Sequence, residues 1–162
     1  MRRFGIIAVI ASCLVLAVTA DAGGSPHADA LTAYQSADYE RAMKLFRPLA
    51  EQGDPQAEYY VGRMYEKGQG VEKDNEQMAL WYRRSAEKGY ARAQYKLAVG
   101  YAFGLGGAEQ DDAEAVKWLK RSAEGGYRRA QKTLARGYSE GRFGLPRDPR
   151  QAEYWNRKAA RR

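Results

Sequence analysis

Few residues of this chain have the types and spacing that catalysis requires. Ser85 and Lys88 form an S-x-x-K pattern, in which a lysine can activate a nucleophilic serine, but no S-D-N or K-T-G sequence accompanies it. The single histidine, His27, and the single cysteine, Cys13, leave no His/Cys metal cluster, no Cys/His dyad and no disulfide. Residues 104–107 are rich in glycine but lack the Lys-Ser/Thr pair of a phosphate-binding loop. The sequence therefore predicts no catalytic residues, no metal site and no cofactor.

The chain repeats itself with a period of 36 or 37 residues. Trp81, Trp118 and Trp155 are each 37 residues apart. Four other residue types keep the same phase: Ala57, Ala93 and Ala130; Tyr65, Tyr101 and Tyr138; Gly68, Gly104 and Gly141; Asp74, Asp111 and Asp148. A degenerate copy precedes them, in which Asp38 and Phe46 correspond to Asp74 and Tyr82. Such a period is typical of a solenoid built from stacked helical hairpins.

Each copy has the start and stop signals of two helices. An aspartate followed three residues later by Gln or Glu forms a capping box at Asp74–Gln77, Asp111–Glu114 and Asp148–Gln151. Asp54-Pro55 can start the first helix of its copy in the same way, and glycines such as Gly68 and Gly89 can end the helices. One hairpin cannot bury its apolar face alone, so stacked copies must share a continuous core.

The expected fold is therefore all-α, a right-handed α-solenoid of about four helix-turn-helix repeats. The expected repeats are residues 30–53, which are degenerate, and then residues 54–89, 90–126 and 127–162. With 162 residues, of which 44% are hydrophobic and 29% charged, the chain has the composition of one folded domain and not of a disordered segment.

The repeated pattern resembles a known family of repeats. Its first full copy carries Ala57, Val61-Gly62, Tyr65, Gly68-x-Gly70, Asp74, Met78 to Tyr82, Ala86 and Gly89, and is similar to the Sel-one-like repeat (SLR), a relative of the tetratricopeptide repeat (TPR). Residues 93–126 and 130–160 resemble the same repeat, and residues 30–53 look more TPR-like. The resemblance implies a protein-interaction scaffold; bacterial exported members serve as adaptors in the cell envelope. It transfers no catalytic residues, because the motif residues are structural.

The first residues are expected to form an export signal and not part of the fold. Met1 to Arg3 are basic, residues 4–18 are almost wholly apolar, and small residues precede the expected cleavage after Ala20 or Ala22. The apolar stretch of about 15 residues is shorter than the ~20 that span a bilayer, which favours a cleaved secretory signal peptide at residues 1–20 over a membrane anchor.

Cleavage would leave a flexible leader at residues 21–29, which contains His27. The alternative is a lipoprotein anchored through Cys13, but the apolar residues that continue after this cysteine disfavour it. We therefore expect a periplasmic or secreted bacterial protein with no membrane span after cleavage and no nucleic acid partner. Removal of Arg2 and Arg3 with the signal lowers the net charge from +7 by two.

Two surfaces are candidates for binding a partner. The first is the concave side, which the first helix of each repeat lines in such solenoids, with candidate residues Tyr59, Tyr60, Arg63, Tyr95 and Arg136. Tyrosine and arginine dominate the energetics of many interfaces. The alternative interpretation is that these side chains pack between the repeats.

The second surface is a basic ridge, formed by the basic pairs that follow each tryptophan: Arg83-Arg84, Lys120-Arg121 and Arg157-Lys158. These pairs would lie along the outer side of the solenoid, where a solvated surface is the simpler interpretation. Otherwise the ridge would bind an acidic partner, an anionic lipid or a polysaccharide.

The sequence thus predicts an exported, non-catalytic scaffold or adaptor that binds a protein or peptide of the cell envelope in its concave groove. The alternative is a module that binds envelope polysaccharide or peptidoglycan through the basic ridge. The chain is expected to be a monomer. Because the last repeat has no capping helix, Tyr154 and Trp155 are expected to be incompletely covered, with end-to-end stacking as the alternative.

Overall fold

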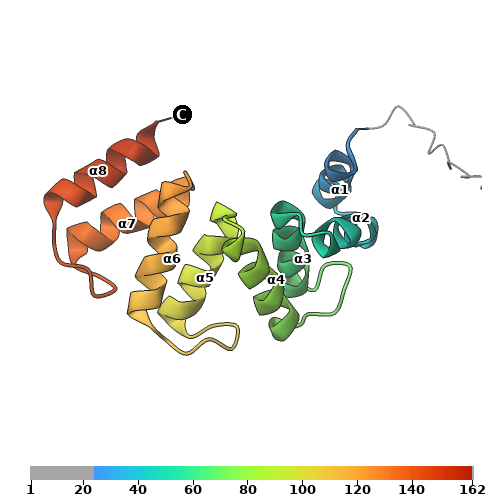
Figure 1. Cartoon of the computed structure of the whole chain (residues 1–162), viewed down its shortest axis with the longest axis horizontal. Coiled ribbons are helices and arrows are strands. Elements are labelled where there is room, and N and C mark those ends of the chain that lie inside the picture. Colours follow the sequence, from blue (N-terminus) through green and yellow to red (C-terminus); the bar gives the residue numbers. More distant parts are fainter. Residues whose placement is uncertain (1–23, 162) are drawn as a thin grey trace, which may run out of the picture.

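The computed structural model describes residues 24–161, and this part of the chain folds into eight helices with no strand (Figure 1). The helices are α1 (Pro26–Gln35), α2 (Tyr39–Glu51), α3 (Pro55–Lys67), α4 (Asn75–Glu87), α5 (Ala91–Phe103), α6 (Asp112–Glu124), α7 (Arg128–Glu140) and α8 (Pro149–Ala160). Their bounds follow the repeat, since α3, α5 and α7 are the first helices of successive copies and α4, α6 and α8 are the second.

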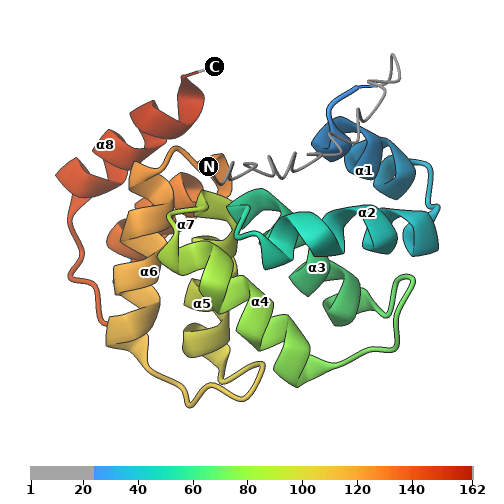
Figure 2. The ribbon, with the colours of Figure 1, turned by 45° about the vertical axis from the view of Figure 1, so that its right-hand side comes forward.

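Consecutive helices pair as four hairpins, which stack in chain order. Helices α1 and α2, α3 and α4, α5 and α6, and α7 and α8 pack within their hairpins, and α2 on α3, α4 on α5 and α6 on α7 join one hairpin to the next. The stack winds in an arc with α1 and α8 at its two ends (Figures 1 and 2). The expected all-α solenoid of four helical hairpins is confirmed.

The capping aspartates start the helices as the sequence predicts. Oδ1 of Asp54 accepts a hydrogen bond from the backbone N–H of Ala57 at 2.6 Å, and Oδ1 of Asp111 accepts one from Glu114 at 3.0 Å. Asp74 and Asp148 make the equivalent bonds at the starts of α4 and α8. These bonds satisfy N–H groups that have no partner within the helix.

The prediction of a flexible leader at residues 21–29 is wrong for Pro26 and the residues that follow it. Ser25 accepts a hydrogen bond from the N–H of Ala28, and Pro26 occupies the first turn, so α1 begins within the expected leader. The ring of His27 packs edge-on against Phe46, with centroids 5.9 Å apart, and its Nδ1 lies 3.8 Å from Asp54 Oδ1. The predicted signal peptide, Cys13 and both cleavage sites lie outside the described residues.

Two hydrogen bonds recur at the same positions of successive repeats. Ser85 Oγ donates to the carbonyl oxygen of Pro55 at 2.5 Å, and Ser122 Oγ donates to that of Ala91 at 2.6 Å. Both serines are fully buried. Ser85 therefore ties α4 to the start of α3, and its position in the S-x-x-K pattern has a structural explanation.

A buried glutamine makes the second recurrent bond. Gln94 Nε2 donates to the carbonyl oxygen of Ala86 at 3.2 Å, and Gln131 Nε2 donates to that of Ala123 at 3.0 Å. Each bond joins the first helix of one repeat to the end of the preceding helix. The backbone carbonyls at these junctions are thereby partnered inside the protein.

Glu58 occupies the same repeat position as these glutamines and is fully buried. Its Oε1 pairs with Arg84 Nε at 3.0 Å and with Lys88 Nζ at 2.7 Å. The position of Lys88 is Gly125 in the next repeat, where the buried residue is a neutral glutamine. The carboxylate and the lysine therefore occur together, because a buried charge needs a charged partner.

The substitution Lys88→Ala is expected to lower the free energy of unfolding by about 1–2 kcal/mol, because Glu58 then stays buried with Arg84 as its one cation. The double variant Glu58→Gln/Lys88→Ala restores the neutral arrangement of the other repeats and is expected to lie within about 0.5 kcal/mol of the native chain. Urea unfolding of both variants measures this coupling. Equal losses in the single and double variants would contradict it.

Candidate functional site

A groove open to solvent lies along the first helices of the second, third and fourth hairpins. Tyr59 and Arg63 of α3, Arg92 and Tyr95 of α5, and Arg129 of α7 line it, and its volume is about 1020 Å³. The other lining residues are Glu66, Lys67, Lys96, Val99 and Tyr127. The groove thus carries three tyrosines and three arginines from three consecutive repeats.

Tyrosine rings pack in pairs at matching positions of two repeats, and three of the four rings line the groove. The rings of Tyr59 and Tyr90 have centroids 5.3 Å apart, and those of Tyr95 and Tyr127 are also 5.3 Å apart. Burial raises the pKa of Tyr59 above its ordinary value, and the charge of Arg63 offsets part of this rise. Its phenol is therefore neutral at physiological pH and can act as a hydrogen-bond donor.

The groove cations differ in how they are held. Arg63 lies over the ring of Tyr34, with its Cζ 5.4 Å from the centroid. Lys96 Nζ lies 2.8 Å from both carboxylate oxygens of Glu66. Within residues 24–161, Arg92 and Arg129 have no carboxylate at ion-pair distance. These two arginines leave the groove with positive charge available to an acidic ligand.

Glu66 also accepts a hydrogen bond from Tyr82 Oη at 2.6 Å. Partial burial acts to raise the pKa of this carboxyl, but the hydrogen bonds from Lys96 and Tyr82 outweigh that effect and the pKa is lowered. Glu66 is therefore ionised at neutral pH and holds both partners in place.

The structure brings three of the five predicted groove residues together, namely Tyr59, Arg63 and Tyr95. Tyr60 lies elsewhere: it is only 8% exposed and stacks on Phe46, with centroids 4.8 Å apart and ring planes at 5°. Its position on α3 faces α2 and not the groove, so its side chain belongs to the core between two hairpins.

Arg136 lies farther along α7, in a separate hollow of about 620 Å³. It shares this hollow with Arg129, Lys132, Arg142 and Phe143, and pairs with Glu140 at 2.8 Å. Arg129 lines both hollows, so the two are neighbours.

The groove residues that sequence reasoning missed include Arg92, Tyr127 and Arg129. A signal for them exists, because Arg92 and Arg129 are one period apart, as are Tyr90 and Tyr127. Each tyrosine is the residue before the first helix of its repeat, a position that the helical pattern alone does not assign to either face.

Most side chains of the predicted basic ridge have partners within the chain. Arg84 and Arg121 lie over Trp81 and Trp118, with Cζ 4.6 and 4.8 Å from the ring centroids. Lys158 lies over Tyr154 at 5.5 Å, and Arg157 pairs with Glu153 at 3.0 Å. Of the remaining two, Arg83 is exposed and lines a hollow of about 1050 Å³ with residues of α3, α4 and α5, and Lys120 is half-buried.

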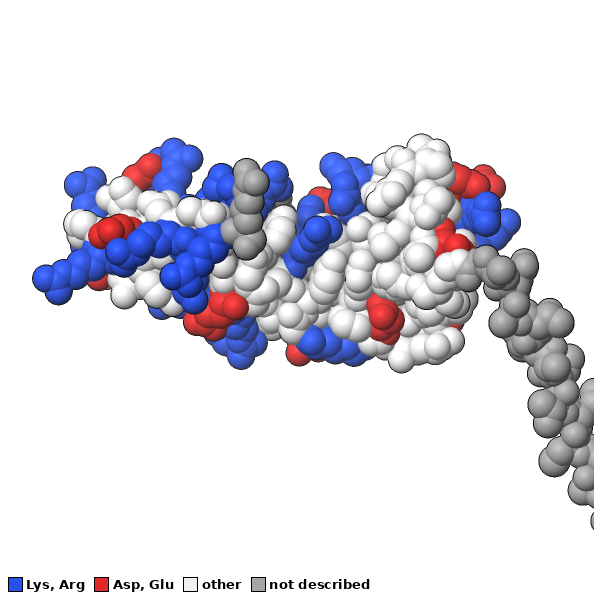
Figure 3. Space-filling view, turned by 90° about the horizontal axis from the view of Figure 1, so that it is seen from above, with Lys and Arg blue, Asp and Glu red and all other residues white. Residues whose placement is uncertain are grey.

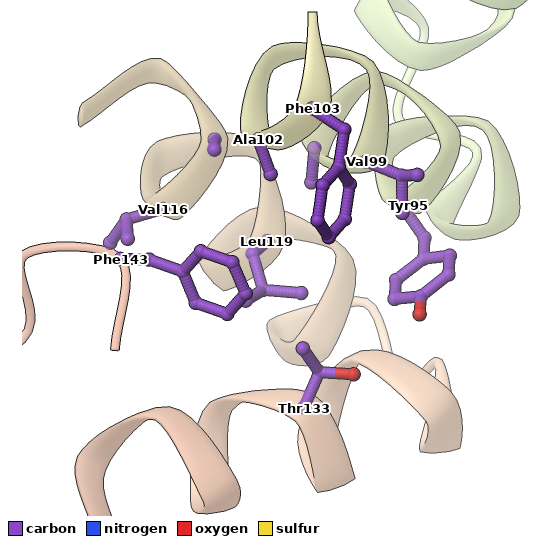
Figure 4. Close-up of a pocket in the computed structure, with 10 residues that line it drawn as sticks. Tyr95, Val99, Ala102, Phe103, Val116, Leu119, Thr133 and Phe143 are labelled. Atoms are coloured by element: carbon purple, nitrogen blue, oxygen red, sulfur yellow. The ribbon is translucent and has the colours of Figure 1, made fainter. Parts of the chain in front are cut away.

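An apolar pocket of about 520 Å³ opens between α5, α6 and α7 (Figure 4). Its lining residues are Tyr95, Ala98, Val99, Ala102, Phe103, Ala115, Val116, Leu119, Thr133 and Phe143. Tyr95 and Val99 also line the groove, so the pocket adjoins it.

At the C-terminal end, Tyr154 is 41% exposed whereas Trp155 is 7% exposed. The expectation of incomplete cover holds for the tyrosine and is wrong for the tryptophan, because Trp155 belongs to the core that α8 forms with the helices before it.

Among the described residues no group of His, Cys, Asp and Glu is placed to hold a metal ion. None of the described helices is long and apolar enough to cross a membrane.

The solved structures that are similar to this chain include two proteins with Sel1 repeats. The crystal structure of a Sel1 repeat protein from Oxalobacter formigenes has a TM-score of 0.77 at 33% sequence identity, over 85% of this chain and 54% of that one. The crystal structure of c5321, a protective antigen of uropathogenic Escherichia coli strains displaying an SLR fold, has a TM-score of 0.71 at 38% identity, over 85% of this chain and 30% of that one.

Curated relatives match over shorter stretches. An uncharacterized protein of Neisseria meningitidis, NMB1327, is 39% identical over 61 residues, and an F-box protein of Arabidopsis thaliana, At1g70590, is 36% identical over 70 residues. The matches cover 38% and 43% of this chain but only 13% and 19% of those proteins. The shared part is the repeat and not the whole relative.

The Sel1 repeat family model matches residues 33–54, 55–90, 91–127 and 129–162. The last three matches span the hairpins α3–α4, α5–α6 and α7–α8, and the first covers α2 with the end of α1, in agreement with the resemblance that the sequence pattern carries. Sel1 repeats form a non-catalytic fold that generally mediates protein–protein interactions. The chain belongs to the Sel1 repeat family.

Proposed function

We propose that this protein is an exported, non-catalytic scaffold that binds a segment of a partner protein in the groove along α3, α5 and α7. The observation that carries this proposal is the groove itself, whose tyrosines and arginines come from three consecutive repeats; Tyr59 is 5% exposed and lies at the base, whereas Tyr95, Tyr127 and the arginines are partly or fully exposed. These residue types give large contact areas and directed hydrogen bonds, as in the centres of many interfaces.

The groove suits an extended segment better than a small molecule. It is open along its length and is lined by positions that recur once per repeat, so that a ligand can contact several repeats at the same time. Tyr95 and Tyr127 provide partly exposed rings, and Arg92 and Arg129 provide charges with no carboxylate partner in the described part of the chain.

Export to the periplasm or beyond is part of the proposal and rests on residues 1–22 of the sequence. Intact-mass measurement of the chain from an envelope extract of its native cell is expected to show a mature form that begins at Asp21 or Gly23. Substitution of both Ala20 and Ala22 by lysine is expected to leave the precursor uncut, because the peptidase needs small residues there. An uncut native chain in the cytosol would contradict export. A lipid on Cys13 would show that the chain is a lipoprotein and is not cleaved after Ala20 or Ala22.

A photo-crosslinking residue in place of Tyr95, in the native envelope, is expected to give one discrete protein adduct. The same residue in place of Glu124, which is exposed on α6 and lines none of the hollows described above, is the matched control and is expected to give none. The double substitution Arg92→Gln/Arg129→Gln is expected to reduce the adduct by about tenfold, because both charges face the ligand.

Equal adducts from Tyr95 and Glu124 would contradict the groove. Failure to form any protein adduct, with binding of purified envelope polymer that falls steeply with added salt, would instead favour the basic ridge.

A further inference from the structure

The space between consecutive repeats is lined differently at the two junctions that join the three full repeats. Between α3, α4 and α5 it holds a polar cluster of Glu66, Tyr82 and Lys96. Glu66 accepts from Tyr82 at 2.6 Å and from Lys96 at 2.8 Å, and Lys96 Nζ lies 5.5 Å from the centre of the Tyr82 ring. Met78 of α4 lies beside this cluster in the same hollow.

One repeat later, a shorter side chain stands at each of these four positions. Ala102 corresponds to Glu66, Leu119 to Tyr82, Thr133 to Lys96 and Ala115 to Met78. All four shorter side chains line the apolar pocket between α5, α6 and α7 (Figure 4). The preceding repeat has a hollow of about 1050 Å³ in the equivalent place, and there the polar cluster and the methionine line it, so the apolar lining is particular to the pocket between α5, α6 and α7.

Two phenylalanines border this pocket (Figure 4). Phe103 is 63% exposed, which is unfavourable for so large an apolar side chain without a partner. Phe143 stands where the preceding repeat has Gly106, and it keeps that glycine's left-handed backbone, with φ +56° against +67°. A bulky residue in this conformation is strained, and such strain is concentrated at binding sites.

The surroundings of the pocket are basic. Thr133 and Phe143 also line the hollow that holds Arg129, Lys132, Arg136 and Arg142. Arg136 and Arg142 share Glu140, whereas Arg129 and Lys132 have no carboxylate at ion-pair distance in the described part of the chain. Lys and Arg side chains outnumber acidic ones over the α7 and α8 end of the molecule, whereas the α1 and α2 end shows both signs of charge among uncharged residues on the same face (Figure 3).

We infer that the pocket between α5, α6 and α7 receives one bulky apolar side chain of an acidic partner segment, whose carboxylates pair with the arginines and lysine of α7. This inference rests on the proposed function and adds to it the chemistry of the partner. Apolar burial in the pocket supplies affinity, and the surrounding charges select an acidic segment over a basic one. A nucleic acid would use the charges and leave the apolar pocket empty.

The first test uses 1-anilinonaphthalene-8-sulfonate, a probe that combines an aromatic body with one negative charge. The native chain is expected to bind one molecule of the probe at the pocket with enhanced fluorescence. The refilled variant Ala102→Glu/Leu119→Tyr/Thr133→Lys carries the polar cluster of the preceding repeat, and it is expected to bind about tenfold more weakly or not at all. Far-ultraviolet circular dichroism checks that this variant is folded.

Two further variants keep the test informative if the refilled chain does not fold. Ala115→Met alone returns the methionine of the preceding repeat and is expected to weaken binding of the probe severalfold. Conversely, the emptied variant carries the shorter side chains of the pocket in the hollow between α3, α4 and α5, through the changes Met78→Ala/Glu66→Ala/Tyr82→Leu/Lys96→Thr. It is expected to create a second site for the probe. Unchanged binding by a folded Ala115→Met variant, with one site in the emptied variant, would overturn the inference.

The second test uses three short labelled peptides: an acidic peptide with one central phenylalanine, its twin with alanine in that place, and a basic peptide with the phenylalanine. Fluorescence anisotropy is expected to show that each of the last two binds about tenfold more weakly than the first. Equal binding of the phenylalanine and alanine peptides would overturn the inference.

The two proposals can fail separately. A discrete protein adduct at Tyr95 that persists at native strength in the refilled variant would keep the scaffold function and remove the pocket from it. Loss of that adduct in the refilled variant, with the dichroism unchanged, would support both.

Discussion

The structure depends on one constraint: no hairpin of this chain can bury its own apolar face, so each must pack against the next. Small residues, among them Ala57, Ala93 and Ala130, sit fully buried at equivalent positions and let the helices approach closely. The buried serine bonds then recur within the second and third hairpins, and the buried glutamine bonds recur at the junctions of α4 with α5 and of α6 with α7. Because these bonds recur from repeat to repeat, residues at equivalent positions of α3, α5 and α7 line one groove.

This constraint also explains where the repeats are free to differ. The junction residues keep their positions, whereas the space between the repeats changes from the charged cluster around Glu66 to the apolar pocket around Leu119. In the first arrangement the carboxylate of Glu66 accepts hydrogen bonds from the ammonium group of Lys96 and the phenol of Tyr82, so the polar groups are partners of one another. The second leaves apolar surface open to solvent, including the ring of Phe103, and this is where we propose that the selection of a partner lies.

The sequence predicts the fold well, because the repeat and the capping aspartates are local signals. It predicts the site less well. Tyr59 and Tyr60 are neighbours on one helix, and the pattern does not show that the second stacks on Phe46 while the first lies at the groove. The pocket is harder to predict from the sequence, because its lining side chains are notable only for being shorter than those at the equivalent positions of the preceding repeat. Only the spatial contact of Glu66, Tyr82 and Lys96 shows that Ala102, Leu119 and Thr133 belong together.

The central claim is that a partner segment occupies the groove and the adjoining pocket at the same time. Methyl NMR of the chain, titrated with a synthetic peptide of the partner segment identified in the cell envelope, tests this most directly. The account predicts shift changes at Val99, which lines both the groove and the pocket, and at Leu119 in the pocket, with none at Leu80, which is exposed on α4 away from both. Changes at Leu80 without changes at Val99 and Leu119 would contradict it.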